Sequence, residues 1–436
     1  MRYLKNLAQA VCLALLLFAS GAQELLAAAN MPPMIIGPQL RVRIAVADPL
    51  DSKAITPLVQ KYILENLSFL PFAVMVDPRT VPGGTSLPAA RGPEVDVKRF
   101  QLAGAHLLIT SAWFQDGRLP RAELRVYDVT TGAFVFGNNY SNLDEARAAG
   151  VADQFCSELM KAITGRGEFF RSTLAFVKSN GPNKRDIWTV TPTGRELRQI
   201  SNMPGDALSP SWSPDGRFIV FGHVDRRTHA LGVWDKITNS VSRKSFPGNT
   251  VIGPCFMPDN KVAVSMSTGR NPSIFLLDHQ FRREGAIIDS ASIDVSPSVD
   301  ASGTKMAFTS SRMGNPHIFL KDLSSGVISR ITYEGRYNTE PAISPDGALI
   351  AFSRQLPEGY RIFVYDMVKK TETQLTFGPG RDEQPSFGPD SYFIAFTSTR
   401  SGTPQIYLTT RNGGEAKRIP TGAGDAMFPR WGLTRK

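Results

Sequence analysis

A repeat of 44 residues fills the C-terminal two-thirds of this 436-residue chain. Each copy opens with a proline in a motif of the form P-x-aromatic-S-P-D-G, which is complete at residues 210–216. Successive prolines are separated by 44, 43, 44, 44 and 44 residues, and the six are Pro210, Pro254, Pro297, Pro341, Pro385 and Pro429. A period held this closely is typical of an array in which each unit buries its apolar face against its neighbours.

Each unit has the pattern of four short strands. In the copy that opens at Pro341, strands are expected at 342–344, 349–353, 361–366 and 373–376, with a tight turn at 345–347 after the first. Four strands in a repeat of this length predict a β-propeller.

The two ends of the array complement each other. The first set of second, third and fourth strands (174–177, 186–190, 197–200) has no proline motif before it, and the last motif, at Pro429, has no such set after it. We therefore expect a six-bladed β-propeller over residues 166–436 that is closed by the C-terminal strand. Such closure leaves no exposed sheet edge.

Residues 41–165 do not contain the 44-residue repeat and have a different pattern of predicted elements. Strand patterns at 41–47, 72–76, 106–115, 121–128 and 134–140 alternate with helical patterns at 55–66, 95–103 and 143–163. We expect a small α/β sandwich domain before the propeller, so that the chain is mainly β. Asn142 is the expected N-cap of the last helix, and residues 165–167 the hinge.

The N-terminus has the order of a secretory signal. Arg2 and Lys5 precede an apolar run at 7–18, and small residues allow cleavage after Ala22 or Ala29. We expect a signal peptide at 1–29, a flexible arm rich in Met and Pro at 30–40, and a mature protein outside the cytoplasm.

Charge and cysteine content narrow the classes of partner. Cys156 and Cys255 are expected to be separate buried thiols, since two cysteines make no disulfide scaffold. The net charge of +10 is compatible with an anionic envelope surface or an acidic partner, and equally with a well-solvated surface. An exported protein is not expected to bind nucleic acid.

No constellation of catalytic residues is present in the sequence. It contains no G-x-S-x-G, no H-E-x-x-H, no P-loop and no dinucleotide-binding glycine motif, and its 5 histidines lack ligand spacing. We therefore expect a protein that is not an enzyme and that has no cofactor and no metal site.

The longer loops are the expected binding surface. In each blade the second-to-third loop and the connection to the next blade leave from the same end, which we call the long-loop face. Acids recur there just before the repeat prolines, at Asp206, Asp294, Glu340, Asp382, Glu383 and Asp425. Arginines recur in the second-to-third loops, at Arg226, Arg270, Arg312, Arg354 and Arg400. Either these charges pair within the face, or the acids line a funnel that takes a basic or polar segment of a partner.

The repeat is shared by TolB proteins and by the propellers of prolyl-oligopeptidase-like enzymes. The signal, the α/β domain, the passage from Glu145-Ala146-Arg147 to residues 171–177, and the terminal residues 428–431 resemble the TolB family. A peptidase would need a hydrolase domain, for which no residues remain. The resemblance covers nearly the whole mature chain.

The resemblance implies a periplasmic component of the Tol–Pal system that supports outer-membrane integrity and cell division. Its expected partners are a Pal-type lipoprotein on the loop face, through which it associates peripherally with the outer membrane, and TolA at the N-terminal arm. The family positions tied to Pal binding correspond to Thr250, Gly253 and Val295. We expect a monomer. The alternatives are a propeller that binds or processes a glycan or peptide, and a purely structural protein.

Overall fold

A computed structural model describes residues 41–50, 55–90, 92, 95–116, 119–179, 181, 184–226, 228–246, 250–267 and 269–433. The expected signal peptide and arm, at 1–29 and 30–40, lie outside these residues. The chain divides into two units. In the described residues, the first runs from Arg41 to Ser68 and from Ala73 to Gly167, and the second comprises Phe69–Phe72 and the chain from Glu168 onward.

The first unit contains a five-stranded sheet in the order β2-β1-β3-β4-β5. β1 pairs in parallel with β2 and β3, and β4 pairs antiparallel with β3 and β5. The strands are β1 (Val42–Val46), β2 (Ala73–Met75), β3 (Leu107–Asp116), β4 (Leu119–Asp128) and β5 (Phe134–Ser141). Their order along the chain, with the helices between them, is the predicted β-α-β-α-β-β-β-α.

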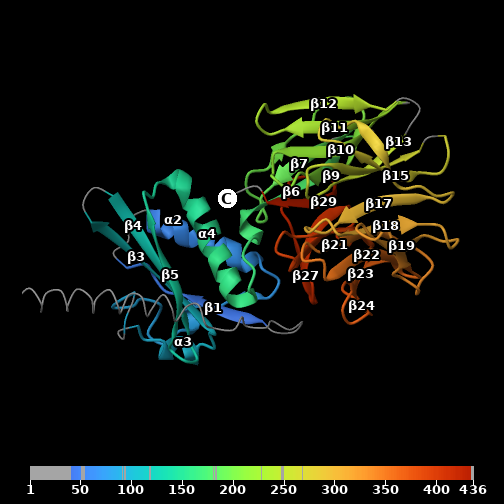
Figure 1. The fold of residues 1–436 in the computed structure, drawn as a ribbon. Coiled ribbons are helices and arrows are strands. Elements are labelled where there is room, and N and C mark those ends of the chain that lie inside the picture. Colours follow the sequence, from blue (N-terminus) through green and yellow to red (C-terminus); the bar gives the residue numbers. More distant parts are fainter. Residues whose placement is uncertain are drawn as a thin grey trace, which may run out of the picture. The chain divides into compact units, whose positions relative to one another are not determined.

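Two long helices, α2 (Ile55–Phe69) and α4 (Glu145–Thr164), lie side by side in this unit (Figure 1). Asn66 donates a hydrogen bond to Asp153 across them at 2.9 Å, and Phe155 of α4 packs against Phe136 of β5. A separate apolar cluster joins alternate strand residues, such as Ala45 and Leu108, to the segment that contains η1 (Pro78–Thr80) and α3 (Lys98–Leu102). The unit therefore has helices and an irregular segment packed around one sheet.

The N-cap predicted at Asn142 is wrong. Asp144 caps α4, because its backbone is extended and its carboxylate accepts a hydrogen bond from the Arg147 amide at 2.8 Å. Asn142 instead has a left-handed φ of 57°, and its carbonyl accepts from the Arg147 guanidinium. Helix α4 ends at Gly165, whose φ of 77° suits a residue without a Cβ.

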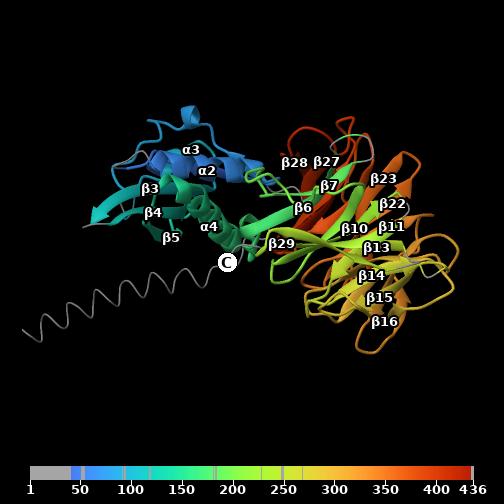
Figure 2. The ribbon, with the colours of Figure 1, turned by 90° about the horizontal axis from the view of Figure 1, so that it is seen from above.

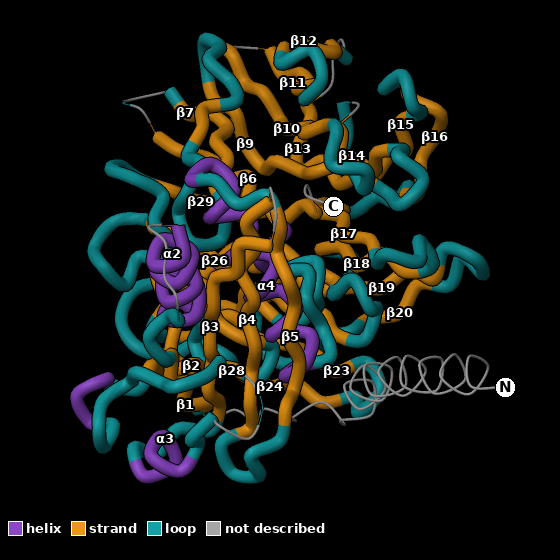
Figure 3. The backbone as a smooth tube through the Cα atoms, turned by 90° about the vertical axis from the view of Figure 1, so that its left-hand side faces the viewer, coloured by secondary structure: helices purple, strands orange, loops and turns teal. Residues whose placement is uncertain are grey.

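The second unit is built from antiparallel sheets in which sequential strands are neighbours. Four of the sheets in the described residues have four strands each, and Figures 2 and 3 show β13–β16 and β17–β20 in this order. Their strands are β13 (Thr250–Phe256), β14 (Val262–Ser267), β15 (Ser273–Leu277), β16 (Arg283–Ile288); β17 (Asp294–Val299), β18 (Lys305–Ser310), β19 (His317–Asp322), β20 (Ile328–Arg330); β21 (Asn338–Ile343), β22 (Leu349–Leu356), β23 (Gly359–Asp366), β24 (Thr371–Gln374); and β25 (Asp382–Phe387), β26 (Phe393–Ser398), β27 (Gln405–Thr410), β28 (Gly413–Arg418).

An eight-stranded sheet combines two further sets of four. One set is β9 (Asp206–Trp212), β10 (Phe218–Asp225), β11 (Thr228–Asp235) and β12 (Ser240–Ser245). The other is β6 (Ser172–Ser179), β7 (Arg185–Val190), β8 (Arg198–Gln199) and the C-terminal strand β29 (Ala426–Leu433). The sets meet at a single parallel pair, Arg185 with Asp206. β29 pairs antiparallel with β6 from Ala426 opposite Lys178 to Leu433 opposite Ser172 (Figure 1).

Apolar side chains fill the space between neighbouring sheets of this unit. One cluster joins Ala263 and Ile274 to Met306 and Phe308, from the next sheet along the chain. The first strands contact one another in the cyclic order β9, β13, β17, β21, β25, β29 and back to β9. Each sheet therefore buries both of its faces against others, as a propeller requires.

A β-bulge interrupts each of these first strands at its repeat proline. In β17, Ser296 and Pro297 together oppose a single residue of β18, between the pairs Val295–Thr309 and Ser298–Ala307. In the described residues the position before the proline is left-handed in six strands, with φ of 50 to 60°, at Ser209, Gly253, Ser296, Glu340, Gln384 and Phe428. A non-glycine residue in this conformation is costly and needs support from its surroundings.

Hydroxyl groups of the preceding sheet supply part of that support. The amide of Glu340 donates a hydrogen bond to Thr309 Oγ1 of β18 at 3.2 Å. Three other bulges repeat this contact: Ser296 N to Ser265 Oγ, Gln384 N to Ser353 Oγ and Phe428 N to Thr397 Oγ1, at 3.1 to 3.2 Å. These bonds satisfy amides that the bulge removes from the strand pairing, and they join neighbouring sheets.

Thr309→Val should lower the free energy of unfolding by about 1–3 kcal/mol, because valine keeps the shape of threonine but leaves the partly buried Glu340 amide without its acceptor. Thr371→Val, on the exposed part of β24, is the matched control and should change it by less than about 0.5 kcal/mol. Urea unfolding of both variants measures the difference. Equal stabilities would contradict the role given to the hydroxyl.

Candidate protein-binding face and central cavity

Two of the predicted rim acids are buried ion-pair partners. Asp294 is the first residue of β17 and pairs with Arg312 at 3.0 Å, and Asp382 holds the same position in β25 and pairs with Arg400 at 3.0 Å. Both carboxylates have no exposed surface. For these residues the charges pair within the face, and the pairs anchor the second-to-third loops to the first strands.

The other three predicted loop arginines differ from one another, and the loop position predicted for Arg354 is wrong because this residue lies within β22. Arg354 is buried and binds Asn338 at 2.7 Å and Glu372 at 2.6 Å, since asparagine occupies the position of the rim acid in β21. Arg226 and Arg270 are exposed. The arginine series therefore combines structural and solvent-facing members.

Glu383, Asp206 and Asp425 remain partly exposed among the predicted acids. Glu383 pairs with Arg381 at 3.2 Å, and the Arg381 guanidinium lies over the Tyr360 ring at 5.0 Å. Burial raises the pKa of the Tyr360 hydroxyl, and the carboxylate of Glu383 and the hydroxyl of Tyr337 raise it further. These four groups form one cluster where β23 and β25 begin.

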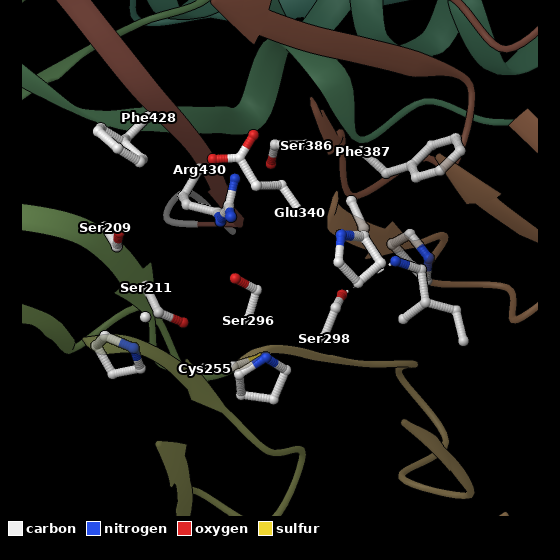
Figure 4. Close-up of a pocket in the computed structure, with 17 residues that line it drawn as sticks. Ser209, Ser211, Cys255, Ser296, Ser298, Glu340, Ser386, Phe387, Phe428 and Arg430 are labelled. Carbon is white, nitrogen blue, oxygen red and sulfur yellow. Dashed lines mark hydrogen bonds between the residues drawn. The ribbon is translucent and has the colours of Figure 1, made fainter. Parts of the chain in front are cut away.

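Glu340 points into a cavity of about 160 Å³ that the first strands enclose (Figure 4). Its Oε2 accepts hydrogen bonds from the Gln384 amide at 3.1 Å and from Ser353 Oγ at 3.3 Å. Burial raises the pKa of Glu340, nearby Glu383 raises it further, and the Arg430 guanidinium opposes this shift. Arg430 lies in the same cavity lining and donates from Nη1 to the carbonyls of Pro385 and Pro429.

The three positions taken from the family resemblance lie on β13 and β17. Thr250 begins β13, and its hydroxyl accepts a hydrogen bond from the Ser267 amide at 3.2 Å. Gly253 is the left-handed bulge residue of β13, with a φ of 55°, and lines the cavity. Val295 is half-buried between Asp294 and the bulge of β17. All three are near the long-loop ends of their strands, as are the predicted acids.

Sequence reasoning missed a set of exposed apolar side chains on the long-loop face. Tyr333 is 69% exposed and Phe377 is 65% exposed, although aromatic residues of this size are usually buried. The set comprises Ile293, Met313, Tyr333, Tyr337 and Phe377. All five lie in connections between strands, where the alternation of apolar and polar residues does not predict burial. Apolar residues in such connections are the sequence signal that could have identified this surface. The turns at the opposite end of the sheets also carry exposed apolar residues, Ile237, Val327 and Val368, but these are aliphatic, whereas three of the five on the long-loop face are aromatic.

The described residues contain no group of three or more His, Cys, Asp or Glu side chains that could hold a metal ion. Cys156 and Cys255 form no disulfide, as predicted; Cys156 is buried as expected, whereas Cys255 is only partly buried and lines the cavity. In the same part of the chain, no helix is long and apolar enough to cross a membrane.

A family model described as "TolB beta propeller domain" matches residues 160–362 and 341–435. The chain belongs to the TolB family. The "Tol-Pal system protein TolB" of Nitratidesulfovibrio vulgaris is 58% identical over 284 residues, 63% of this chain and 64% of the relative. The match therefore spans less than two-thirds of that relative's length. The "Protein TolB homolog" of Chlorobium chlorochromatii is 33% identical over 186 residues, 43% of this chain and 42% of the relative.

The crystal structure of TolB from Acinetobacter baumannii has the same fold. It aligns with a TM-score of 0.75 over 91% of this chain and 97% of that one, at 20% sequence identity. This chain therefore shares the fold of that protein, a propeller with a preceding domain.

Asp382→Ala should lower the free energy of unfolding by about 3–5 kcal/mol, because the largely buried Arg400 guanidinium loses the carboxylate that pairs with it. Glu415→Ala, which removes an exposed partner of Lys417, should cost less than about 1 kcal/mol. Denaturant unfolding of both variants provides the comparison. A small effect of Asp382→Ala would show that the pair does not anchor the loop.

Glu340→Gln should be stabilised relative to the parent protein as pH rises from about 4 to 8. An acid whose pKa is higher in the folded than in the unfolded state contributes stability while protonated, and this contribution is lost as pH rises above its ordinary value of 4.5. Thermal unfolding across this range measures the difference, with Glu415→Gln as the exposed control. Parallel curves for Glu340→Gln and the parent would contradict the assignment.

Proposed function

We propose that this TolB-family chain is a non-catalytic adaptor of the Tol–Pal system in the periplasm. In this proposal it binds a Pal-type lipoprotein through the long-loop face and TolA through the arm at 30–40, as a monomer associated with the outer membrane through its partner. The role would be to support outer-membrane integrity and cell division. Its relatives carry the name of that system, and the sequence has the order of a secretory signal.

The observation that carries the proposal is the exposure of three aromatic side chains in the blade-to-blade connections of the long-loop face. Tyr333, Tyr337 and Phe377 supply large, amphipathic or apolar contact area, which is the kind that dominates binding energy at protein interfaces. Tyr337 belongs to the cluster with Tyr360, Arg381 and Glu383, which adds charged groups that can orient a partner.

Within the predicted binding residues, burial suggests a division of roles. Glu383, Asp425, Thr250 and Val295 keep exposed surface and are proposed as direct contacts. Asp294 and Asp382 are buried in ion pairs and are proposed to hold the loops that make contact. Gly253 and Glu340 line the cavity and are proposed to support the long-loop face without touching the partner.

We also infer that the propeller has six blades, closed where β29 completes the set of β6, β7 and β8. The cyclic contacts of the six first strands and the pairing of β29 with β6 support this count. The domain bounds proposed with it are a signal peptide at 1–29, an arm at 30–40, an α/β domain at 41–165 and the propeller at 166–436.

Tyr337→Ala and Glu383→Lys should each weaken binding of the lipid-free Pal-type lipoprotein at least about tenfold, a loss of about 1.4 kcal/mol. Tyr337→Ala removes an aromatic contact surface, and Glu383→Lys reverses a charge on the long-loop face. Biolayer interferometry with the immobilised full chain measures the affinity.

Glu415→Lys, on β28 toward the opposite end of its sheet, is the matched charge control and should bind with parental affinity. Failure of the folded parent protein to bind the lipoprotein would sink the proposed function. Parental affinity in both Tyr337→Ala and Glu383→Lys would instead exclude this part of the face.

A further inference from the structure

The cavity enclosed by the first strands is lined in two layers of opposite charge. One layer consists of the residues before the repeat prolines, and Glu340 is its one carboxylate in the described chain. The other consists of the residues after those prolines: Ser211, Cys255, Ser298, Ala342, Ser386 and Arg430. Figure 4 shows Glu340, Arg430 and the serines around the same space.

The serines of the second layer are arranged as hydrogen-bond donors. Ser211 Oγ accepts from the Phe256 amide and Ser298 Oγ from the Ile343 amide, both at 3.0 Å, and Ser386 Oγ accepts from the Trp431 amide at 3.4 Å. Each hydroxyl oxygen thus accepts one hydrogen bond from the backbone of the following sheet. The hydroxyl hydrogen remains to be donated, and the cavity is the space beside it.

Arg430 adds a positive charge to this donor layer. Only its Nη1 is used in hydrogen bonds to described residues, both to backbone carbonyls. Nε and Nη2 retain their donors. Guanidinium and hydroxyl donors together match the oxygens of a carboxylate.

Glu340 provides the complementary group in the other layer. Its Oε2 is held by Gln384 and Ser353, whereas the described residues give Oε1 no hydrogen bond. Glu340 and Arg430 influence each other electrostatically, yet no ion pair within 4.0 Å joins them in the described chain. Two opposite charges that share a small cavity without contact leave room for a ligand that carries both signs.

We propose that this cavity binds a small zwitterion of the α-amino-acid class, with its carboxylate on Arg430 and the serine hydroxyls and its ammonium group on Glu340. A cavity of about 160 Å³ has room for several water molecules and therefore for a small amino acid such as glycine or alanine. The site lies inside the propeller and does not rest on the adaptor role.

Isothermal titration calorimetry of the full chain with glycine, L-alanine, acetate and methylammonium tests the proposal. Glycine or alanine should bind with a Kd of the order of 1 mM, and acetate and methylammonium at least about tenfold more weakly, since each satisfies only one of the two charges. Arg430→Gln and Glu340→Gln should each weaken glycine binding at least about tenfold.

Lys417→Gln and Glu415→Gln, a surface opposite-charge pair outside the cavity lining, are the matched controls and should bind glycine as the parent does. Thermal unfolding confirms that each variant is folded. If Arg430→Gln fails to fold, Arg430→Lys keeps the charge but loses the forked donor and should bind less tightly than the parent.

Three results would overturn the proposal. The first is that glycine and alanine give no binding heat up to about 50 mM, which would mean that the cavity holds only water. The second is equal affinity for acetate and glycine, which would make it a simple anion site. The third is parental glycine affinity in both Glu340→Gln and the folded Arg430 variant.

Discussion

The structure depends on the backbone pairing of β29 with β6, strands separated by about 250 residues of chain. Without this pairing, both ends of the array would present rows of unpaired amides and carbonyls, which are costly when buried and prone to pair with other chains. The aromatic ring of Phe169 packs on Trp431 and on Phe393, so the entry to the first strand and the last strand share apolar contacts. The remaining sheets can then bury both faces against neighbours.

The bulges of the first strands connect this architecture to the cavity. Each bulge turns the residue before the proline into a left-handed conformation, and in four of the six the amide of that residue donates to a hydroxyl of the preceding sheet. Most of the bulge residues and their neighbours after the proline line one small space. A feature that spaces and locks the sheets thus also brings Glu340 and Arg430, 90 residues apart in the chain, into one cavity.

The long-loop face divides its charges between structure and surface. Asp294 and Asp382 form buried ion pairs with loop arginines, whereas Glu383 remains partly exposed near Tyr360. Both readings of the charge pattern are therefore represented, at different residues. The exposed aromatic groups of the connections supply what a charged rim alone lacks, namely apolar area for a partner to bury.

Much of the fold could be predicted from the sequence, because the period of the prolines and the alternation within each unit are local patterns with a direct backbone meaning. The element order of the first unit followed in the same way. The cap of α4 was misplaced by two residues, since both Asn142 and Asp144 are suitable cap residues and only the backbone conformation chooses between them. The candidate site was predicted less well, because a rim acid that pairs with an arginine and one that faces solvent have the same local sequence.

The sequence by itself determined the repeat, the propeller and the absence of familiar catalytic motifs, since each follows from residue type and spacing along the chain, and its motifs resemble those of the TolB family. Tertiary structure alone decided which charges are buried, which aromatic residues are exposed, and that Glu340 shares a cavity with Arg430. Burial and electrostatic environment depend on atoms from distant sheets, and no local pattern encodes which sheets will surround a side chain.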